Sequence, residues 1–372
     1  MHLPWCVRKC PYCDFNSHAA RGVIPFEEYI QALLGDLEAE LPGIWGRVVH
    51  SIFIGGGTPS LFPASHIESL LNGIKARCIL EPAAEVTLEA NPGSVEHDRF
   101  SAYRDAGINR ISLGVQSFSD PRLAAIGRIH NAGEAVDAIH SVREAGFNNI
   151  NLDLMYGLPG QNIQAAVDDV AEAISHAPEH ISHYQLTLEP NTLFAVDPPA
   201  LPGEEELDEM QEQCLGALAA TGYHQYEVSA YARDGQTCRH NVNYWRFGDY
   251  LGIGAGAHGK ITLAAEGRVV RRAKHKNPRQ YLVGGTGERW LAEEKVLGDS
   301  DLLFEFFLNQ LRLKSGVKIA DFSARTGLPW NVASERVDHA VNRGLLLESG
   351  GFLAATELGW NHLNSLQGMF LP

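Results

Sequence analysis

Short apolar runs alternate with helical patterns through the first half of the chain. Runs at 50–54, 85–89, 110–115, 150–154 and 180–187 predict buried strands. Amphipathic patterns at 26–41, 67–78, 95–106, 134–145 and 164–176 predict helices between them. Together with a short first strand at 1–3, they make about six βα units, which predict a parallel sheet.

Polar residues follow several of these strands at their carboxyl ends. They are Thr58, Glu89, Gln116 and Asp153. In parallel barrels and open α/β sheets, ligands bind at that edge. We therefore expect these side chains to lie together in one site.

The second half is less regular. A Pro- and acid-rich loop at 198–206 precedes a helix ending at 220 and a strand at 223–228. The segment 231–260 is rich in Gly, His and aromatic residues, and a basic tract follows at 268–276. Short helices and two strands, at 344–347 and 351–354, predict a winged-helix-like module. We expect two domains, a barrel over 1–290 and this module over 291–372.

Composition excludes several classes of function. Thirty basic and 45 acidic residues among 372 give a net charge of −15, which argues against general affinity for nucleic acid. The module lacks the basic face of a DNA reader, so we expect it to serve in packing or docking. No apolar run approaches the roughly 18 residues that span a bilayer, and no signal peptide is evident. We expect a cytoplasmic protein with reduced thiols.

The strongest chemical motif is a C-x3-C-x2-C cluster formed by Cys6, Cys10 and Cys13. Three thiols on a four-iron cluster would leave one iron open to a small ligand, since such clusters normally use four cysteines. A zinc knuckle is the alternative, with His18 as its fourth ligand. The spacing and the βα context favour the iron–sulfur cluster. We expect the other cysteines, Cys78, Cys214 and Cys238, to be small buried hydrophobes.

Two glycine-rich segments and one histidine motif are weaker candidates. The turn 55–59 (Gly-Gly-Gly-Thr-Pro) would let a ligand approach the backbone and offer it unpaired N–H groups. The motif His240-Asn-Val-Asn-Tyr-Trp245 would suit a haem ligand with aromatic neighbours, although a lone histidine beside aromatics is more often a packing residue. The glycine-rich run 252–259 lacks the Lys-Ser/Thr of a phosphate loop, and close packing explains it better.

These motifs together resemble the radical S-adenosylmethionine superfamily. The resemblance rests on the cysteine cluster, the Gly-Gly-Gly-Thr-Pro turn, Glu-Ala-Asn-Pro, Gly-Val-Gln-Ser and Asn-Leu-Asp-Leu-Met-Tyr-Gly, and it covers nearly the whole chain. It points to the coproporphyrinogen oxidase-like branch. Within that branch, Cys13-Asp-Phe15 and the His240 motif are similar to those of haem chaperones.

The resemblance implies a partial (β/α)6 barrel with a [4Fe–4S] cluster on the three cysteines. S-adenosylmethionine would chelate the open iron, with Glu89 at its ammonium, Arg128 at its carboxylate and Asp153 at its ribose. The residues implied to contact it are Tyr12, Gly56, Gly57, Thr58, Glu89, Gln116, Arg128 and Asp153. The residues implied to hold haem b are His240, Tyr244 and Trp245, with His240 as covalent or axial ligand.

Two departures from the family pattern matter. The family carries a tyrosine six residues before its first cysteine, a position that here precedes Met1, so we expect a trimmed first strand or a start further upstream. The oxidases also carry a fourth cysteine where this chain has Phe15.

The resemblance implies a haem chaperone that delivers haem to acceptor haemoproteins of the respiratory chain. Its implied partners are haem, those acceptors and an electron donor such as flavodoxin or ferredoxin, with a homodimer and peripheral membrane association left open. The alternative is an oxygen-independent coproporphyrinogen III oxidase of porphyrin biosynthesis. Phe15 and the His240 motif favour a chaperone that lacks oxidase activity. The sequence leaves open whether it cleaves S-adenosylmethionine.

Overall fold

The computed structural model describes residues 1–93, 99–284 and 290–371. Its largest sheet has eight strands in the order β1-β4-β5-β6-β7-β8-β10-β9. The first six run parallel: β1 (His2–Leu3), β4 (Val48–Gly56), β5 (Ile79–Ala90), β6 (Arg110–Gln116), β7 (Ile150–Tyr156) and β8 (His180–Gln185). Two antiparallel strands, β10 (Ala230–Ala232) and β9 (His224–Glu227), extend the sheet. The predicted partial barrel of six parallel strands is confirmed.

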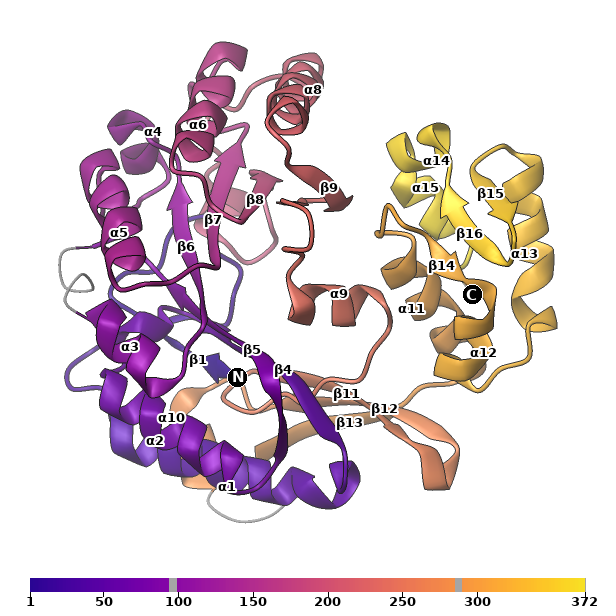
Figure 1. The fold of residues 1–372 in the computed structure, drawn as a ribbon, viewed down its shortest axis with the longest axis horizontal. Coiled ribbons are helices and arrows are strands. Elements are labelled where there is room, and N and C mark those ends of the chain that lie inside the picture. The colour runs from indigo at the N-terminus through magenta and orange to yellow at the C-terminus, as the bar shows by residue number, and fades with distance from the viewer. Residues whose placement is uncertain (94–98, 285–289, 372) are drawn as a thin grey trace.

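Helices lie along the outer face of this curved sheet (Figure 1). They are α1 (Phe26–Ile44), α2 (Ala64–Lys75), α3 (Phe100–Ala106), α4 (Asp120–Ala125), α5 (Ala132–Glu144), α6 (Ile163–Ser175) and α8 (Glu204–Ala220). Their apolar sides pack on strands that are buried on both faces, as every residue of β6 is. The first residues of the helix predicted at 95–106 lie outside the described residues, and α3 begins at Phe100.

Side-chain caps explain where two of these helices begin. Asn131 accepts a hydrogen bond from the Glu134 backbone N–H, and the Glu134 carboxylate accepts one from Asn131, which forms a capping box before α5. The Asn162 side chain caps α6 by accepting a single hydrogen bond from the Ala165 N–H at 3.0 Å. Asn162 ends the loop that follows β7, and Asn131 ends the loop that follows α4.

A three-stranded antiparallel sheet lies below the barrel in Figure 1 and reaches toward the C-terminal module. Its strands are β11 (His258–Leu263), β12 (Arg268–Lys274) and β13 (Leu291–Val296), and α10 (Pro278–Gly284) follows β12. The buried Lys274 of β12 pairs with Asp36 at 2.5 Å and Glu40 at 2.6 Å, both in α1. Strand β13 begins just after the expected domain boundary at 290, and it is hydrogen-bonded to β12. It therefore belongs to the sheet that precedes the boundary.

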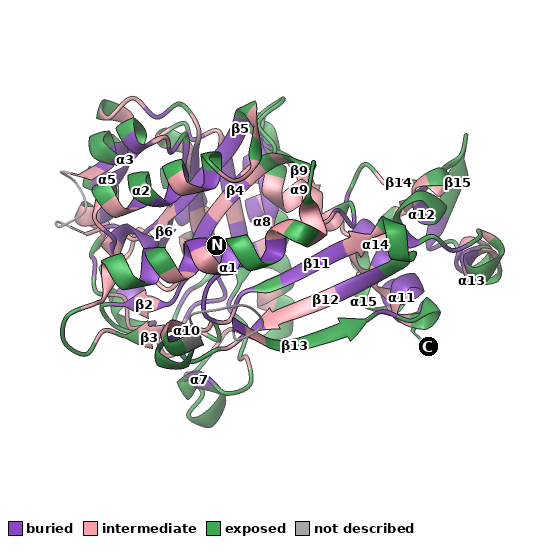
Figure 2. Ribbon diagram, turned by 90° about the horizontal axis from the view of Figure 1, so that it is seen from below, coloured by how far each residue is buried: buried purple, intermediate pink, exposed green. Residues whose placement is uncertain are grey.

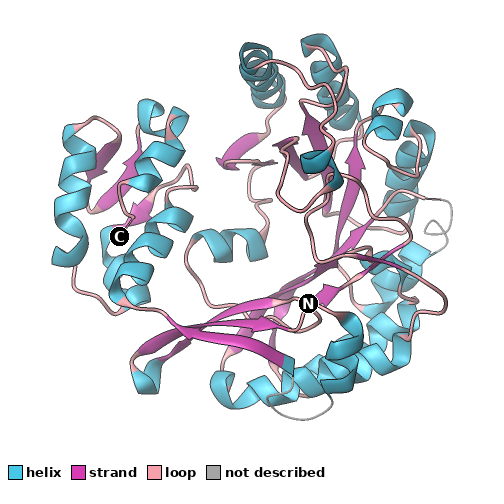
Figure 3. Ribbon diagram, turned by 180° about the vertical axis from the view of Figure 1, so that it is seen from behind, coloured by secondary structure: helices cyan, strands magenta, loops and turns pink. Residues whose placement is uncertain are grey.

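The C-terminal module has its own core, which includes Phe306, Phe307 and Phe322. Its elements are α11 (Asp299–Gln310), β14 (Val317–Lys318), α12 (Ile319–Thr326), α13 (Asn331–Asn342), β15 (Leu346–Ser349), β16 (Phe352–Ala355), α14 (Glu357–Asn361) and α15 (Leu363–Gly368). The strand order β14-β16-β15 and the helices around it give a winged-helix-like arrangement, as predicted (Figure 3). Burial concentrates in the barrel strands, whereas β13 and α13 are largely exposed (Figure 2).

Between barrel and module lies a short helix, α9 (Arg239–Trp245), within the segment that showed no clean periodicity (Figure 1). Across the described ranges, we find no helix with the length and apolar character that crossing a membrane requires.

Candidate functional site

A cavity of about 510 Å³ opens at the carboxyl ends of the parallel strands. It brings together nearly all of the residues that the sequence marked as candidates. These are Cys6, Cys10, Tyr12, Cys13, Gly56, Gly57, Thr58, Glu89, Gln116, Arg128, Asp153, His240 and Trp245. Tyr244 is not among the described lining residues; its ring packs edge-on against His240 and Tyr250, with centroids 6.4 and 4.4 Å away.

Cys6 ends the short strand β2 (Trp5–Cys6), and Cys10 and Cys13 lie on the loop that joins it to the parallel strand β3 (His18–Ala19). The Cys13 N–H donates to the Cys10 carbonyl at 3.2 Å, which closes a tight turn between two of the thiols. Burial raises the pKa of Cys6. The Arg128 guanidinium donates to Cys10 Sγ at 3.8 Å.

Gly57 lets the end of β4 lie against this loop. A Cβ at this position would come within 2.5 Å of the Trp5 carbonyl oxygen and 3.0 Å of Cys6 Sγ. Backbone atoms cannot yield as a flexible side chain can, so only glycine fits without moving the loop. The three thiols line one cavity, the Arg128 cation lies beside them, and the backbone at Gly57 packs closely on their loop. This arrangement fits a cluster held by three cysteines.

The glycine turn differs from expectation in one respect. Its N–H groups are already used: Gly57 donates to Leu3, Thr58 to Trp5, and Gly56 to the Glu89 carboxylate at 3.0 Å. The prediction of unpaired N–H groups is therefore wrong, because β1 and the cysteine loop pack directly on the turn. The turn instead lets the backbone lie close to the cysteine loop, and the Gly56 N–H holds the Glu89 carboxylate in place.

Glu89 is a half-buried carboxylate beside another acid, Asp153. Burial and the charge of Asp153 raise the pKa of Glu89 to about 7. An ammonium group placed here would favour the ionised form and pull that pKa down again. The geometry thus suits the ammonium of an amino acid.

Asp153 is held by three donors that the sequence analysis missed. Ser112 Oγ donates to it at 3.1 Å, Asn151 Nδ2 at 2.7 Å, and the Tyr184 hydroxyl also donates. All three line the cavity. The period-two alternation of a strand could have found Asn151, because it stands two positions before Asp153 on β7 and shares its face.

Arg128 and Gln116 have different surroundings. Arg128 Nη2 donates to Asn91 Oδ1 at 2.6 Å and to the Gly114 carbonyl at 2.7 Å, so protein partners already orient its guanidinium. Asn91, which belongs to the Glu-Ala-Asn-Pro motif, also donates to Thr58 Oγ1 at 2.8 Å. Gln116 has a φ of 69°, and its buried Oε1 has no hydrogen-bond partner within the described chain. That oxygen is available to a ligand.

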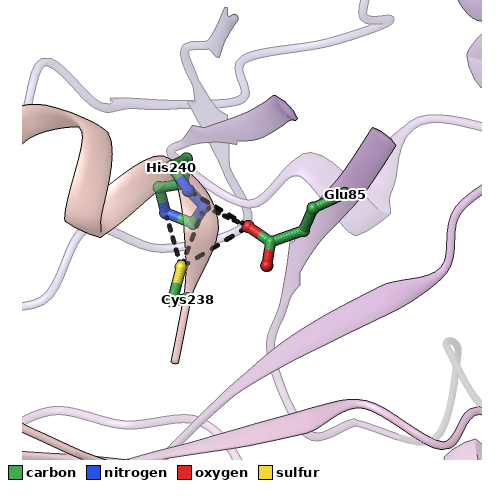
Figure 4. A group of neighbouring side chains, drawn as sticks. All are labelled: Glu85, Cys238 and His240. Atoms are coloured by element: carbon green, nitrogen blue, oxygen red, sulfur yellow. Dashed lines mark hydrogen bonds and ion pairs between the residues drawn. The ribbon is translucent and has the colours of Figure 1, made fainter. Parts of the chain in front are cut away.

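His240 stands in the first turn of α9 with 15% of its side chain exposed. Its ring stacks on Phe53, with centroids 4.2 Å apart and planes inclined by 26°. Its Nδ1 lies 3.1 Å from Glu85 Oε1 and 3.0 Å from Cys238 Sγ (Figure 4). The backbone N–H groups of Arg239 and His240 also donate to Glu85, at 3.0 and 3.2 Å.

Electrostatics set the protonation of this pair. Burial lowers the pKa of His240, so the imidazole is neutral near pH 7. Although burial alone would raise it, the hydrogen bond from His240 and the charge of Arg110 bring the pKa of Glu85 down to about 2. With Nδ1–H donated to the Glu85 carboxylate, the lone pair resides on Nε2.

Cys238 has a fuller role than the packing residue we expected. It is buried, with 3% of its surface exposed, but its Sγ contacts His240 and lies 3.6 Å from Glu85 Oε1. Cys214 is a core residue as expected, and Cys78 is half-buried.

The C-terminal module contributes Arg312 to the cavity wall. Its guanidinium lies over the Trp245 ring, 4.3 Å from the centroid, and Nη2 donates to Glu227 at 3.4 Å. The module therefore packs on α9 through a cation–π contact next to the site.

Comparisons with known proteins agree with this geometry. Residues 1–173 match the family model of the radical SAM superfamily, and residues 298–362 match the HemN C-terminal domain. The whole chain is 48% identical to the heme chaperone HemW of Escherichia coli K12 over 97% of that protein. The chain belongs to the HemW family. The HemW of Haemophilus influenzae is 49% identical, over 100% of this chain and 97% of that protein.

The HemW family membership also explains the fold. The solved structure of coproporphyrinogen III oxidase HemN from Escherichia coli superposes with a TM-score of 0.83, covering 99% of this chain and 88% of that one at 20% identity. This likeness shows a shared radical SAM fold with a C-terminal domain. The superfamily implies a [4Fe–4S] cluster and S-adenosylmethionine as cofactors.

Proposed function

We propose that this protein binds haem b through His240 and hands it to acceptor haemoproteins, including those of the respiratory chain. The observation that carries the proposal is that the His240 imidazole lines the same cavity as the three cysteines. Because the Nδ1–H group donates to Glu85, the lone pair that a haem iron requires lies on Nε2, which is 3.5 Å from Cys238 Sγ.

The chain's own residues suit the two other cofactors. Cys6, Cys10 and Cys13 would hold the [4Fe–4S] cluster, and the Arg128 guanidinium lies 3.8 Å from Cys10 Sγ. Glu89 would receive the ammonium of S-adenosylmethionine, and Asp153, oriented by its three donors, would receive the ribose hydroxyls. When bound, the cluster supplies a reducing electron and an open iron for the amino acid part of that ligand.

The surroundings of His240 favour a flat apolar ligand. Phe15 and Trp245 line the cavity, and Phe15 is 60% exposed although it is a large aromatic residue. An exposed aromatic ring facing a cavity gains stability when a ligand covers it. Phe15 also occupies the position where the oxidases carry a further cysteine.

The proposed partners follow from this chemistry. Haem, an acceptor haemoprotein and an electron donor of the flavodoxin or ferredoxin type are the partners we propose, together with a homodimer and contact with a membrane surface. Thiols kept free as cluster ligands suit the reducing cytosol, where we place the protein.

Haem transfer tests the proposal directly. Anaerobically reconstituted protein loaded with one haem is mixed with an apo-haemoprotein, and the Soret band of the acceptor is followed against free haem at the same concentration. We expect transfer from the loaded protein without loss of haem to solution. An acceptor that fills only at the rate set by free haem would contradict the proposal.

A second assay separates the chaperone from a decarboxylating enzyme. The same protein is incubated with S-adenosylmethionine, a reductant and coproporphyrinogen III. We expect no multiple turnover. Protoporphyrinogen formed catalytically would overturn a chaperone role without oxidase activity.

A further inference from the structure

Glu85, Cys238 and His240 form a compact group of three different ligand types (Figure 4). Cys238 and His240 line the cavity, whereas Glu85 is not among its described lining residues. Nδ1 of His240 lies 3.1 Å from Glu85 Oε1 and 3.0 Å from Cys238 Sγ, and those two atoms are 3.6 Å apart. The group joins strand β5 to the start of α9. It does not include the three cysteines of the N-terminal loop.

These separations resemble one face of a tetrahedral metal site. Zinc binds sulfur at about 2.3 Å and nitrogen or carboxylate oxygen at about 2.0–2.2 Å, so two ligand atoms on one ion lie roughly 3.3–3.6 Å apart. The N–O and S–O separations are within a few tenths of an ångström of these values, and the N–S separation would have to widen by about 0.5 Å. A thiolate with an imidazole favours zinc over the hard cations magnesium and calcium.

We propose that Glu85, Cys238 and His240 bind a zinc ion, with the fourth coordination position open to the cavity. The ligand atoms are Glu85 Oε1, Cys238 Sγ and His240 Nδ1. A three-ligand site with one open position is typical of exchangeable or catalytic zinc rather than of a closed structural site.

The neighbouring groups support this assignment. The Arg239 and His240 backbone N–H groups hold the Glu85 carboxylate at the site, as outer-shell donors commonly do for metal ligands. Binding displaces the Cys238 thiol proton, so the carboxylate and the thiolate supply two negative charges to the dication. The buried Arg110 adds a positive charge nearby and makes the site weaker than one without it.

Zinc at this place would control which nitrogen of His240 is free, a consequence that rests on the proposed function. A neutral imidazole that binds zinc through Nδ1 carries its proton on Nε2. A haem iron needs the lone pair on Nε2. Zinc and haem iron therefore exclude each other, and release of zinc returns the Nδ1 proton to the hydrogen bond with Glu85.

The metal site is tested first, in the full chain carrying Cys6→Ala, Cys10→Ala and Cys13→Ala. The only thiols left are then those of Cys78, Cys214 and Cys238. Cobalt(II) replaces zinc as a spectroscopic probe, and we expect one equivalent with sulfur-to-cobalt charge transfer and tetrahedral d–d bands. Cys238→Ser should abolish the charge transfer, and Glu85→Gln should weaken cobalt binding at least tenfold.

Cys214→Ser is the matched control because its thiol is also buried but lies in the barrel core. It should keep the cobalt spectrum, and circular dichroism checks that every variant is folded. A folded parent chain that shows no tetrahedral cobalt, or a spectrum unchanged by Cys238→Ser, would overturn the proposal.

Competition is tested next with the cluster in place, by titrating haem with and without zinc. We expect zinc to weaken haem binding at least tenfold in the wild type. If cobalt binds through Cys238 but zinc leaves haem binding unchanged, the metal site stands and His240 loses its haem role. If cobalt does not bind while haem binding depends on His240, the metal site falls and the proposed function stands.

Discussion

The carboxylate of Glu85 and the imidazole of His240 are 155 positions apart in the chain, and they meet at 3.1 Å. The strand β5 brings one and the first turn of α9 brings the other. The Nδ1–H group of His240 donates to Glu85, which leaves the lone pair on Nε2 for the proposed haem iron, and this hydrogen bond helps to keep Glu85 ionised.

Replacing Glu85 by glutamine should remove an acid-sensitive part of the stability. The folded pKa of about 2 lies below the ordinary 4.5, so its contribution is complete above pH 4.5 and is lost as the pH falls toward 2. A shift of this size corresponds to about 3 kcal/mol of unfolding free energy. Urea unfolding should show the variant destabilised by about 3 kcal/mol at pH 7 and by less than half of that at pH 3, because the group is only partly protonated there in the wild type.

Glu81→Gln is the control for that experiment, because this partly exposed carboxylate lies on the same strand and pairs with His50 at 2.9 Å. It should change the unfolding free energy by less than about 1 kcal/mol at either pH. Equal losses in the two variants would contradict a special role for Glu85.

Binding of S-adenosylmethionine should depend on pH through Glu89. Its pKa of about 7 in the free protein means that the carboxyl is mostly ionised at pH 8 and mostly protonated at pH 6. An ammonium is attracted only by the ionised form, so affinity should fall about tenfold from pH 8 to pH 6. Calorimetry on the cluster-reconstituted protein measures this.

Glu89→Gln should bind weakly at both pH values, whereas Glu209→Gln, a change at an exposed position of α8, should keep the wild-type profile. A Glu89→Gln variant with undiminished, still pH-dependent affinity would show that another group receives the ammonium.

Gly57→Ala should impair assembly of the cluster. The added Cβ would collide with the Trp5 carbonyl and approach Cys6 Sγ, so the cysteine loop must move. We expect iron content after reconstitution to fall to less than half of the wild-type value. Gly216→Ala is the control, because its Cβ meets nothing within 4 Å on helix α8, and it should bind iron normally and be slightly more stable.

Much of the barrel could be predicted because its strands are apolar runs bounded by amphipathic helices. Glu89, Gln116 and Asp153 could be placed at one site because carboxyl ends of parallel strands share an edge. The use of the glycine N–H groups could not be predicted, since it depends on how the cysteine loop packs on the turn. The Glu85–Cys238–His240 group could not be predicted either, because nothing local to either segment says where α9 will lie.

Haem binding by His240 is tested most directly by comparing His240→Ala with His176→Ala. His176 is a close structural match: its side chain is 10% exposed, lies 3.2 Å from Glu172 and stacks on Phe118, but it is not among the described residues that line the cavity. Haem titration of both anaerobically reconstituted variants, followed at the Soret band, should give wild-type affinity for His176→Ala and at least a thirtyfold loss for His240→Ala. Equal affinity in the two variants would contradict the assignment of His240 as the haem ligand.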